Sequence, residues 1–153
     1  MKKHRLALMV IAGLFLTTSL NAQIGIKFRG SGSWCIGDRY DQAFIVSNQE
    51  TVVGQIMSID TVTPFRDMGS GIMFVLKTER EDINVHLGPA WFILYQDMSL
   101  QVNDKNIEVR GCRTMIGGKP VIMASTLVRR DRVLLLRDKD GIPYWCAWRR
   151  KMD

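Results

Sequence analysis

The sequence has few of the residues that catalytic and metal centres commonly use. It contains two histidines, of which His4 lies in the charged first five residues and His86 is the other. Without those first residues the chain has a single histidine, so a metal site with several histidines from one chain is excluded. A zinc ion at His86 would need cysteine or carboxylate ligands as well. The three cysteines form neither a C-x-x-C redox motif nor a C-x-x-C-H haem attachment motif.

Long apolar runs are also absent, apart from one near the start. Leu6–Leu20 follows the charged residues M-K-K-H-R and leads to the small residue Ala22, and about 15 residues fall short of a comfortable membrane span. This pattern predicts a secretory signal peptide over residues 1–22, cleaved before Gln23. The alternative is an uncleaved membrane anchor. We therefore expect a periplasmic or secreted protein with no membrane span after cleavage.

Cysteine is scarce and its number is odd, the three being Cys35, Cys112 and Cys146. Export would place them in an oxidising compartment, where one disulfide can form. At least one thiol then stays free or pairs between chains. The sequence alone does not select the pair.

A strong excess of one charge is missing from the body of the chain. From Gln23 onward there are 18 Lys and Arg against 15 Asp and Glu, a net charge of +3 that does not by itself indicate a polyanionic partner. From Arg129 onward, eight basic and four acidic residues give a local charge of +4. The basic character is therefore concentrated in the C-terminal part.

Short β-type segments dominate the chain from residue 49 onward. The stretch "INVHL" at 83–87 alternates apolar and polar residues, as half-buried strands do, and "IGGK" at 116–119 is typical of a tight hairpin turn. Gly54 within the first segment predicts a bulge or tight coiling. The predicted strands cover residues 50–60, 72–78, 83–87, 106–115 and 120–128.

One helix is predicted between the third and fourth strands. Gly88 suits the N-cap, and Pro89 suits the first helical position, where its missing N–H is not needed. Leu87 and Phe92 fit the two positions of a hydrophobic staple. The helix is expected to end between residues 97 and 100, and its apolar stripe to plug the core. That stripe consists of Trp91, Leu94, Tyr95 and Met98.

A helix between the third and fourth of five strands is the element order of the OB-fold, a small Greek-key barrel. The predicted fold class is therefore mainly β: a five-stranded OB-fold Greek-key barrel over residues 49–128. An irregular segment, residues 23–48, precedes the barrel. Residues 129–153 follow it as a basic Trp/Arg hairpin and tail, in which Asp140-Gly141 favours a positive-φ turn.

Several stretches between Thr51 and Arg150 form a recognisable set: "TVVGQIMSID", "VHLGPAWF", "DKNIEVRGCR", "GGKPVIMA" and "LLLRDKDGIPYWCAWRR". On these stretches the chain resembles the small exported OB-fold proteins of bacteria, which are often labelled DNA-binding by automatic transfer. The resemblance implies an exported binding protein rather than a catalyst, with some members near redox and cytochrome systems. Cys112, Cys146 and the cysteine-bearing stretch "GSWCIGDRY" depart from the pattern of that group.

His86 lies on the face of its predicted strand opposite Ile83, Val85 and Leu87. Three roles remain open for it. The preferred role is structural, as a hydrogen-bonding residue at the strand end. The second is ligand binding. The third is general-base catalysis, for which Cys112 is the only motivated nucleophile.

Aromatic and basic residues are interleaved in the C-terminal stretch "RDKDGIPYWCAWRRK", residues 137–151. Arginine stacks on indole rings, and Trp and Arg dominate interface hot spots, so the stretch predicts a docking patch for a protein partner or an anionic ligand. The other interpretation, which the sequence favours slightly, is a closing hairpin with buried tryptophans and solvated arginines, and both can hold for different residues. The candidate binding residues are Trp145, Trp148, Arg149, Arg150 and Arg137, with Arg113 and His86 as weaker candidates.

Together these patterns predict a non-catalytic binding module without a cofactor. We expect an accessory subunit that docks onto an envelope or extracellular protein complex, a redox or cytochrome complex if the resemblance extends that far. Nucleic-acid binding is disfavoured, because the second and third strands offer only Phe74 and Lys77 for stacking and charge. A binder of a small ion or metabolite, and a thiol-redox protein built on Cys112 or Cys146, remain as alternatives.

Overall fold

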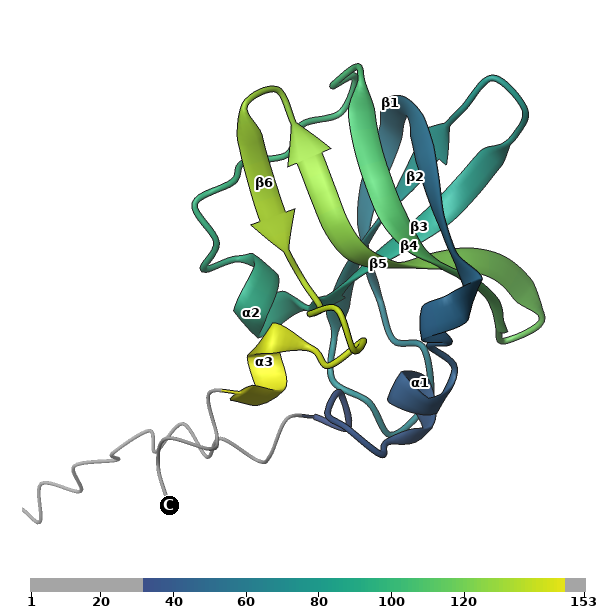
Figure 1. Ribbon diagram of the computed structural model, residues 1–153, viewed down its shortest axis with the longest axis vertical. Coiled ribbons are helices and arrows are strands. Elements are labelled where there is room, and N and C mark those ends of the chain that lie inside the picture. The colour runs from purple at the N-terminus through teal and green to yellow at the C-terminus, as the bar shows by residue number, and fades with distance from the viewer. Residues whose placement is uncertain (1–31, 148–153) are drawn as a thin grey trace, which may run out of the picture.

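The computed structural model describes residues 32–147 of the chain (Figure 1). The predicted signal peptide, the first part of the segment that follows it, and the last six residues lie outside this range. Among the described residues, no helix is both long enough and apolar enough to cross a membrane.

The described chain is mainly β, as predicted, with few and short helices. Six strands form one sheet in the order β3-β2-β1-β4-β5-β6, and neighbours in this order are antiparallel. The strands are β1 (Gln49–Val62), β2 (Gly71–Lys77), β3 (Asp82–Pro89), β4 (Ile107–Ile116), β5 (Lys119–Arg129) and β6 (Arg132–Leu135). The five predicted strands coincide with β1 to β5 apart from their end residues.

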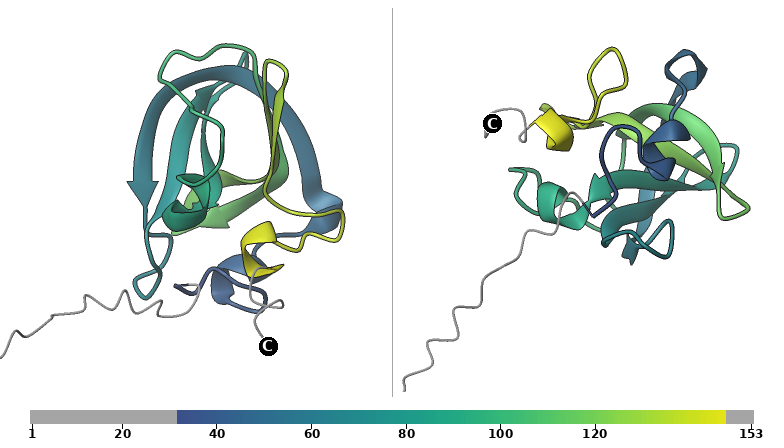
Figure 2. Two further views of the ribbon diagram at one scale, coloured as in Figure 1. Left: turned by 90° about the vertical axis from the view of Figure 1, so that its left-hand side faces the viewer. Right: turned by 90° about the horizontal axis from the view of Figure 1, so that it is seen from below.

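The sheet also has a pairing that links strands far apart in this order. β3 pairs in parallel with β5 through residues 84–86 and 121–123. Each of the strands β1 to β5 therefore has a hydrogen-bonded strand on both sides. Figure 2 shows the strong curvature of the sheet, most clearly in β1.

β1 also changes its pairing partner along its length. Up to Gly54 it pairs with β4, and from Gln55 it pairs with β2. A Cβ atom on Gly54 would lie 2.2 Å from the carbonyl oxygen of Lys77, so only glycine permits this approach of two backbones. The register shifts between Ile56 and Ser58, which confirms the bulge predicted near this glycine.

The helix after β3 is shorter than predicted and begins later. α2 covers Ala90–Ile93, with Pro89 as its extended N-cap. Pairing with Ile72 and Gly71 of β2 holds Gly88 and Pro89 in the strand. The prediction placed the helix start one residue too early, because local preferences do not reveal this pairing.

The predicted apolar stripe of the helix is largely wrong. The buried residues of α2 are Phe92 and Ile93, and Phe92 packs edge-to-face on Trp145 with ring centroids 5.5 Å apart. Of the predicted stripe only Met98 packs, partly, against the core. The exposed members are Trp91, Leu94 and Tyr95. A single turn buries only the side that faces β3 and the C-terminal segment.

The predicted C-terminal hairpin is only partly formed. β6 pairs with β5, but the chain beyond it makes one isolated bridge, between Arg137 and Pro143, and then the helix α3 (Tyr144–Ala147). Pro143 has no N–H with which to extend a ladder. The predicted turn is confirmed, since Gly141 has φ 81° and donates its N–H to the Asp138 carbonyl at 3.0 Å.

The described part of the N-terminal segment packs against one end of the sheet. It contains α1 (Arg39–Gln42) and a 3-10 turn, η1 (Val46–Asn48). Trp34 and Tyr40 are among the largest fully buried side chains, with ring centroids 4.7 Å apart in an edge-to-face contact. Figure 1 shows α1, α2 and α3 gathered at this end. The segment therefore contributes to the core.

Candidate functional site

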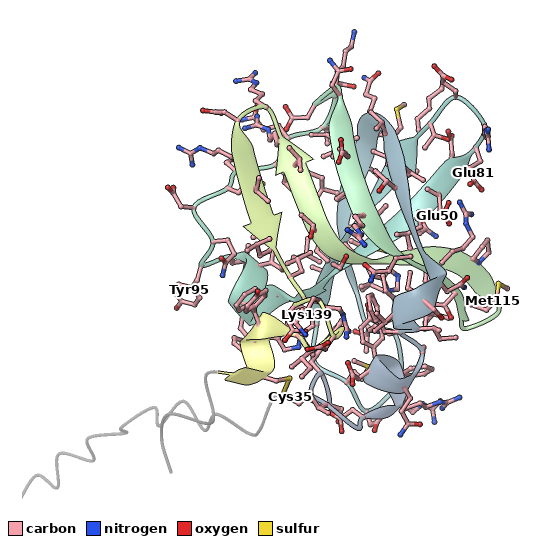
Figure 3. All side chains as sticks on the ribbon, in the orientation of Figure 1. Cys35, Glu50, Glu81, Tyr95, Met115 and Lys139 are labelled. Carbon is pink, nitrogen blue, oxygen red and sulfur yellow. A yellow bond between two sulfur atoms is a disulfide. The ribbon has the colours of Figure 1, made fainter. Side chains whose placement is uncertain are left out.

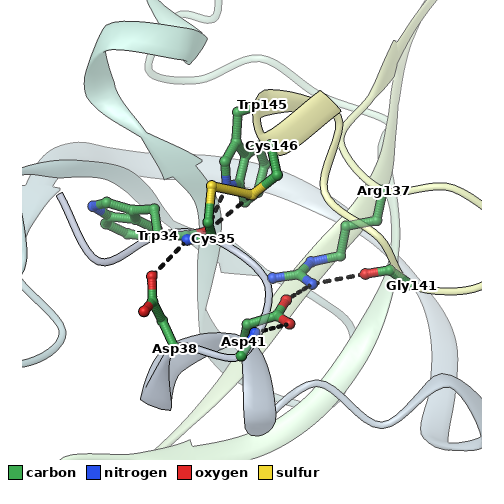
Figure 4. Close-up of a disulfide and its surroundings, with 9 residues drawn as sticks. Trp34, Cys35, Asp38, Asp41, Arg137, Gly141, Trp145 and Cys146 are labelled. Atoms are coloured by element: carbon green, nitrogen blue, oxygen red, sulfur yellow. Dashed lines mark hydrogen bonds and ion pairs between the residues drawn. A yellow bond between two sulfur atoms is a disulfide. The ribbon is translucent and has the colours of Figure 1, made fainter. Parts of the chain in front are cut away.

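A disulfide joins the two ends of the described chain (Figure 4). It links Cys35 to Cys146 across 111 residues of sequence, with Cα atoms 5.4 Å apart. Beside it, the indole N–H of Trp145 donates to the carbonyl oxygen of Trp34 at 2.7 Å. The N-terminal segment and α3 are thus held together by one covalent bond and one buried hydrogen bond.

Cys112 is the remaining free thiol and is fully buried in β4. Its Sγ accepts a hydrogen bond from the N–H of Ile45 at 3.3 Å. The prediction of one disulfide with one thiol left over is confirmed. Because reactive cysteines occupy accessible sites, the burial of Cys112 favours a structural role.

Arg137, predicted as part of an exposed docking patch, is buried. Its Nη1 donates to the carboxylate of Asp41 at 2.6 Å and to the Gly141 carbonyl at 2.8 Å. Its guanidinium lies 4.3 Å from the centre of the Phe44 ring and 5.5 Å from that of Trp145. Trp145 is also buried. The burial of Trp145 agrees with the closing hairpin rather than with an exposed patch. The burial of Arg137 corrects both interpretations, because Asp41 of α1 supplies a counter-charge that the tail pattern does not reveal.

Three further members of the predicted patch, Trp148, Arg149 and Arg150, lie outside the described residues. The structure therefore leaves their role as a prediction.

His86 is buried in β3. Its ring stacks on Tyr40 with centroids 6.1 Å apart and planes 11° from parallel. Burial lowers the pKa of His86 to about 4, so the imidazole is neutral at pH 7, and the same burial raises the pKa of Tyr40. Within residues 32–147, Nδ1 of His86 has no hydrogen-bond partner.

The nucleophile–base pair considered for His86 and Cys112 is not assembled. Both residues pair with Met123 of β5, from opposite sides of that strand. Two strand spacings separate their backbones by about 10 Å. A nucleophile and its base need hydrogen-bond contact at about 3 Å, so this arrangement does not activate the thiol.

The buried His86 predicts a specific loss of stability in weak acid. The folded pKa is depressed below 6.5 to about 4, so the unfolded chain gains a proton first as the pH falls. Stability is therefore full above pH 6.5 and decreases by about 2 kcal/mol between pH 7.5 and pH 5. In His86→Phe, which keeps a ring beside Tyr40 but cannot titrate, most of this decrease should vanish when urea unfolding is measured at both pH values. An unchanged pH dependence in His86→Phe would contradict the assignment.

Arg113 is the only predicted site residue that the structure places on an accessible surface within residues 32–147. Its guanidinium contacts the carboxylates of Glu50 in β1 and Glu81 in the β2–β3 turn. These hydrogen bonds raise the pKa of Arg113 and lower the pKa of Glu81. The three side chains tie the β2–β3 turn to the body of the sheet, and Figure 3 shows Glu50 and Glu81 on the same side of the molecule.

An open cleft of about 820 Å³ surrounds these ion pairs. Four further charged side chains line it and make no ion pair within the described part of the chain: Lys77, Glu79, Arg80 and Lys105. Because Arg113 is paired with Glu50 and Glu81, the charges of the cleft that remain unpaired are three cations and one anion. The sequence indicates Arg113 but not the cleft, whose only local signal is the charged turn "ERED" at 79–82.

Metal binding is not favoured by the described residues. Between residues 32 and 147, no three His, Cys, Asp or Glu side chains are placed to hold a metal ion together. The carboxylates of the cleft are instead engaged by arginine.

The protein is mainly β, and charged side chains line its accessible cleft. The candidate nucleophile Cys112 and the candidate base His86 do not meet. The chain matches the MamS/MamX magnetosome protein family over residues 48–134, more than half of its length, and it belongs to that family. The match extends from the start of β1 into β6 and so covers almost all of the sheet. No curated protein and no solved structure matches the chain.

Proposed function

We propose that this protein is a non-catalytic accessory component of a magnetosome protein complex, acting as an exported OB-fold binding module. Membership of the magnetosome family supports the setting. The predicted signal peptide supports export, to a periplasmic or extracellular position.

Strand pairing supports assignment to the OB-fold. The neighbours run β1-β2-β3-β5-β4 and return to β1, and the β3–β5 contact is parallel. A short helix, α2, separates β3 from β4. A closed five-stranded Greek-key barrel with a helix at this place is the OB-fold arrangement. β6 adds a sixth strand to one edge.

We propose that the protein is not a catalyst because its candidate catalytic residues are buried or already paired. His86 and Cys112 are both buried and lie on opposite sides of β5. The guanidinium of Arg113 is bound by two carboxylates. None of these three groups is available to a substrate in the form that acid–base or nucleophilic catalysis requires.

The observation that carries the binding function is the cleft around Arg113. It combines a large open volume with free charges of both signs. Such surfaces favour electrostatic complementarity with a protein partner, which gives specificity and a fast encounter. The cleft therefore replaces the C-terminal tail as the proposed docking surface within residues 32–147.

Site-specific photo-crosslinking in the native host tests this proposal. A crosslinking residue replacing Thr51, which is exposed on the cleft wall, should capture a defined protein partner. Adding Arg80→Glu and Lys105→Glu should reduce the yield of that adduct about tenfold or more, because two cations of the cleft are reversed.

The matched control carries the crosslinking residue at Val133, an exposed position of β6 outside the cleft. It should give little of the same adduct. Equal capture from both positions, or an adduct that is insensitive to the charge reversal, would contradict docking through the cleft.

A further inference from the structure

One edge of β1 is left without a partner strand over its first half. Residues 49–54 pair with β4, and pairing with β2 begins only at Gln55, which lies opposite Lys77. β2 ends at Lys77, and the β2–β3 turn follows. The edge of residues 50–54 that faces away from β4 therefore meets no strand within residues 32–147.

Thr51 and Val53 direct their backbone polar groups to this open edge. In an antiparallel strand, the N–H and C=O of successive residues point to alternate edges. Ile56 exchanges backbone hydrogen bonds with Asn103 and Asp104, which lead into β4, so the even-numbered residues of this half face β4 as well. In the described part of the chain, no loop backbone group bonds to Thr51 or Val53. Two N–H donors and two C=O acceptors are therefore available at this edge.

The open edge forms a wall of the Arg113 cleft. Six consecutive residues, 50–55, line the cleft. Because successive side chains of a strand point to opposite faces, a run without gaps indicates that the cleft follows the edge of β1 rather than one of its faces. The ion pair between Glu50 and Arg113 bounds the edge at one end, and the pairing of Gln55 with Lys77 bounds it at the other. The four residues between these ends span about 13 Å.

The charge of the cleft selects an acidic partner. Its unpaired cations are Lys77, Arg80 and Lys105, all of which are exposed, and they stand against the single unpaired anion Glu79. Acidic side chains along a bound segment would be complementary to this excess of positive charge. The side chain of Val53, which is 50% exposed, offers an apolar contact at the same edge.

We propose that the open edge of β1 in the Arg113 cleft binds a short, extended, acidic segment of a protein partner as an additional strand. This inference rests on the proposed docking function of the cleft and names the conformation and charge of the segment that docks. In strand addition, main-chain hydrogen bonds provide affinity and side-chain contacts provide specificity. A helix cannot satisfy the edge, because its backbone groups are bonded internally. A nucleic acid would use the cations but not the alternating donors and acceptors.

Amide hydrogen exchange measured by NMR tests strand addition on the full chain, expressed for export and purified as the cell processes it. The probe is a capped hexapeptide in which glutamate alternates with valine. It should slow exchange at the amides of Thr51 and Val53 about tenfold or more, because both gain a hydrogen-bond acceptor. The amides of Val52 and Gly54, which face β4, are the matched control and should change little.

The role of charge is tested with the same probe. A peptide with lysine in place of glutamate should give no protection, and Arg80→Glu with Lys105→Glu should weaken binding of the glutamate peptide about tenfold or more. The control is Val133→Glu, three strand spacings or about 14 Å from Val53 across the sheet. Because charges beyond a Debye length are screened, this variant should bind within about twofold of the unsubstituted protein. Urea unfolding of the variants establishes equal folding.

Several results would overturn strand addition. They are the absence of protection at Thr51 and Val53, equal protection by the lysine peptide, and unchanged binding by the charge variant. Protection of these two amides without peptide that is lost on dilution would identify a second copy of the chain as the occupant and would also overturn it. If crosslinking from Thr51 captures a partner while the peptide protects neither amide, the docking function stands and strand addition fails, so the two failures are distinguishable.

Discussion

Removing the Cys35–Cys146 disulfide is expected to lower the free energy of unfolding by about 4 to 5 kcal/mol. The bond closes a loop of 111 residues, and the entropy that a cross-link removes from the unfolded chain grows with loop length to about that value. Cys35→Ala with Cys146→Ala should show the loss in urea unfolding at pH 7. The loss is a large share of the stability of an ordinary domain.

A reductant provides the matched comparison. It should destabilise the unsubstituted protein by a similar amount and leave the double alanine variant unchanged, because the remaining thiol, Cys112, takes no part in the bond. A double variant as stable as the parent would mean that packing around Trp34 and Trp145 already holds the two ends together without the bond.

The second large effect is expected at the buried ion pair between Asp41 and Arg137. Asp41→Ala should cost about 3 to 5 kcal/mol, because it leaves an arginine whose side chain is 1% exposed without its counter-charge. Adding Arg137→Met should recover part of that loss, since the double variant no longer buries a charge. Urea unfolding of the two single variants and the double variant measures the coupling.

The exposed pair between Lys139 and Asp140 is the control for this cycle, because both of its side chains are largely exposed. Asp140→Ala should leave stability essentially unchanged, as exposed ion pairs contribute little. If the Asp41→Ala and Arg137→Met costs are simply additive, the two charges are not the coupled pair that their geometry indicates.

Local patterns were sufficient to predict most of the sheet. The alternation in "INVHL" and the "IGGK" turn depend on neighbouring residues only, and both correspond to observed elements, β3 and the β4–β5 turn. Gly54 was also interpretable from sequence, because a glycine inside a strand marks a place where backbones approach closely.

The sequence-based predictions are wrong where contacts between residues far apart in the chain determine the local structure. Both interpretations of the tail place Arg137 at the surface, but Asp41 lies 96 residues before Arg137 and provides its buried partner. The length of α2 was overestimated because pairing with β2 retains Pro89 in the strand. Tertiary contacts of this kind override the intrinsic preference of a short segment.

The candidate site was predicted in part. Arg113 is a weaker candidate in the sequence, and its two carboxylate partners lie 63 and 32 residues away along the chain. No local pattern identifies such a cluster. The cleft is lined by residues of β1, of the β2–β3 turn and of β4, which lie far apart in the sequence.

The position of the disulfide has a consequence for the order of events during synthesis. A chain that emerges from its N-terminus presents Cys35 first, then Cys112, and the native partner Cys146 last. The first pair available to an oxidant is therefore a mismatched one. Early burial of Cys112 against Ile45 would keep that thiol out of reach until the last helix arrives. The thiol of Cys112 is then protected by the same N-terminal segment that carries Cys35, the cysteine with which it would mispair.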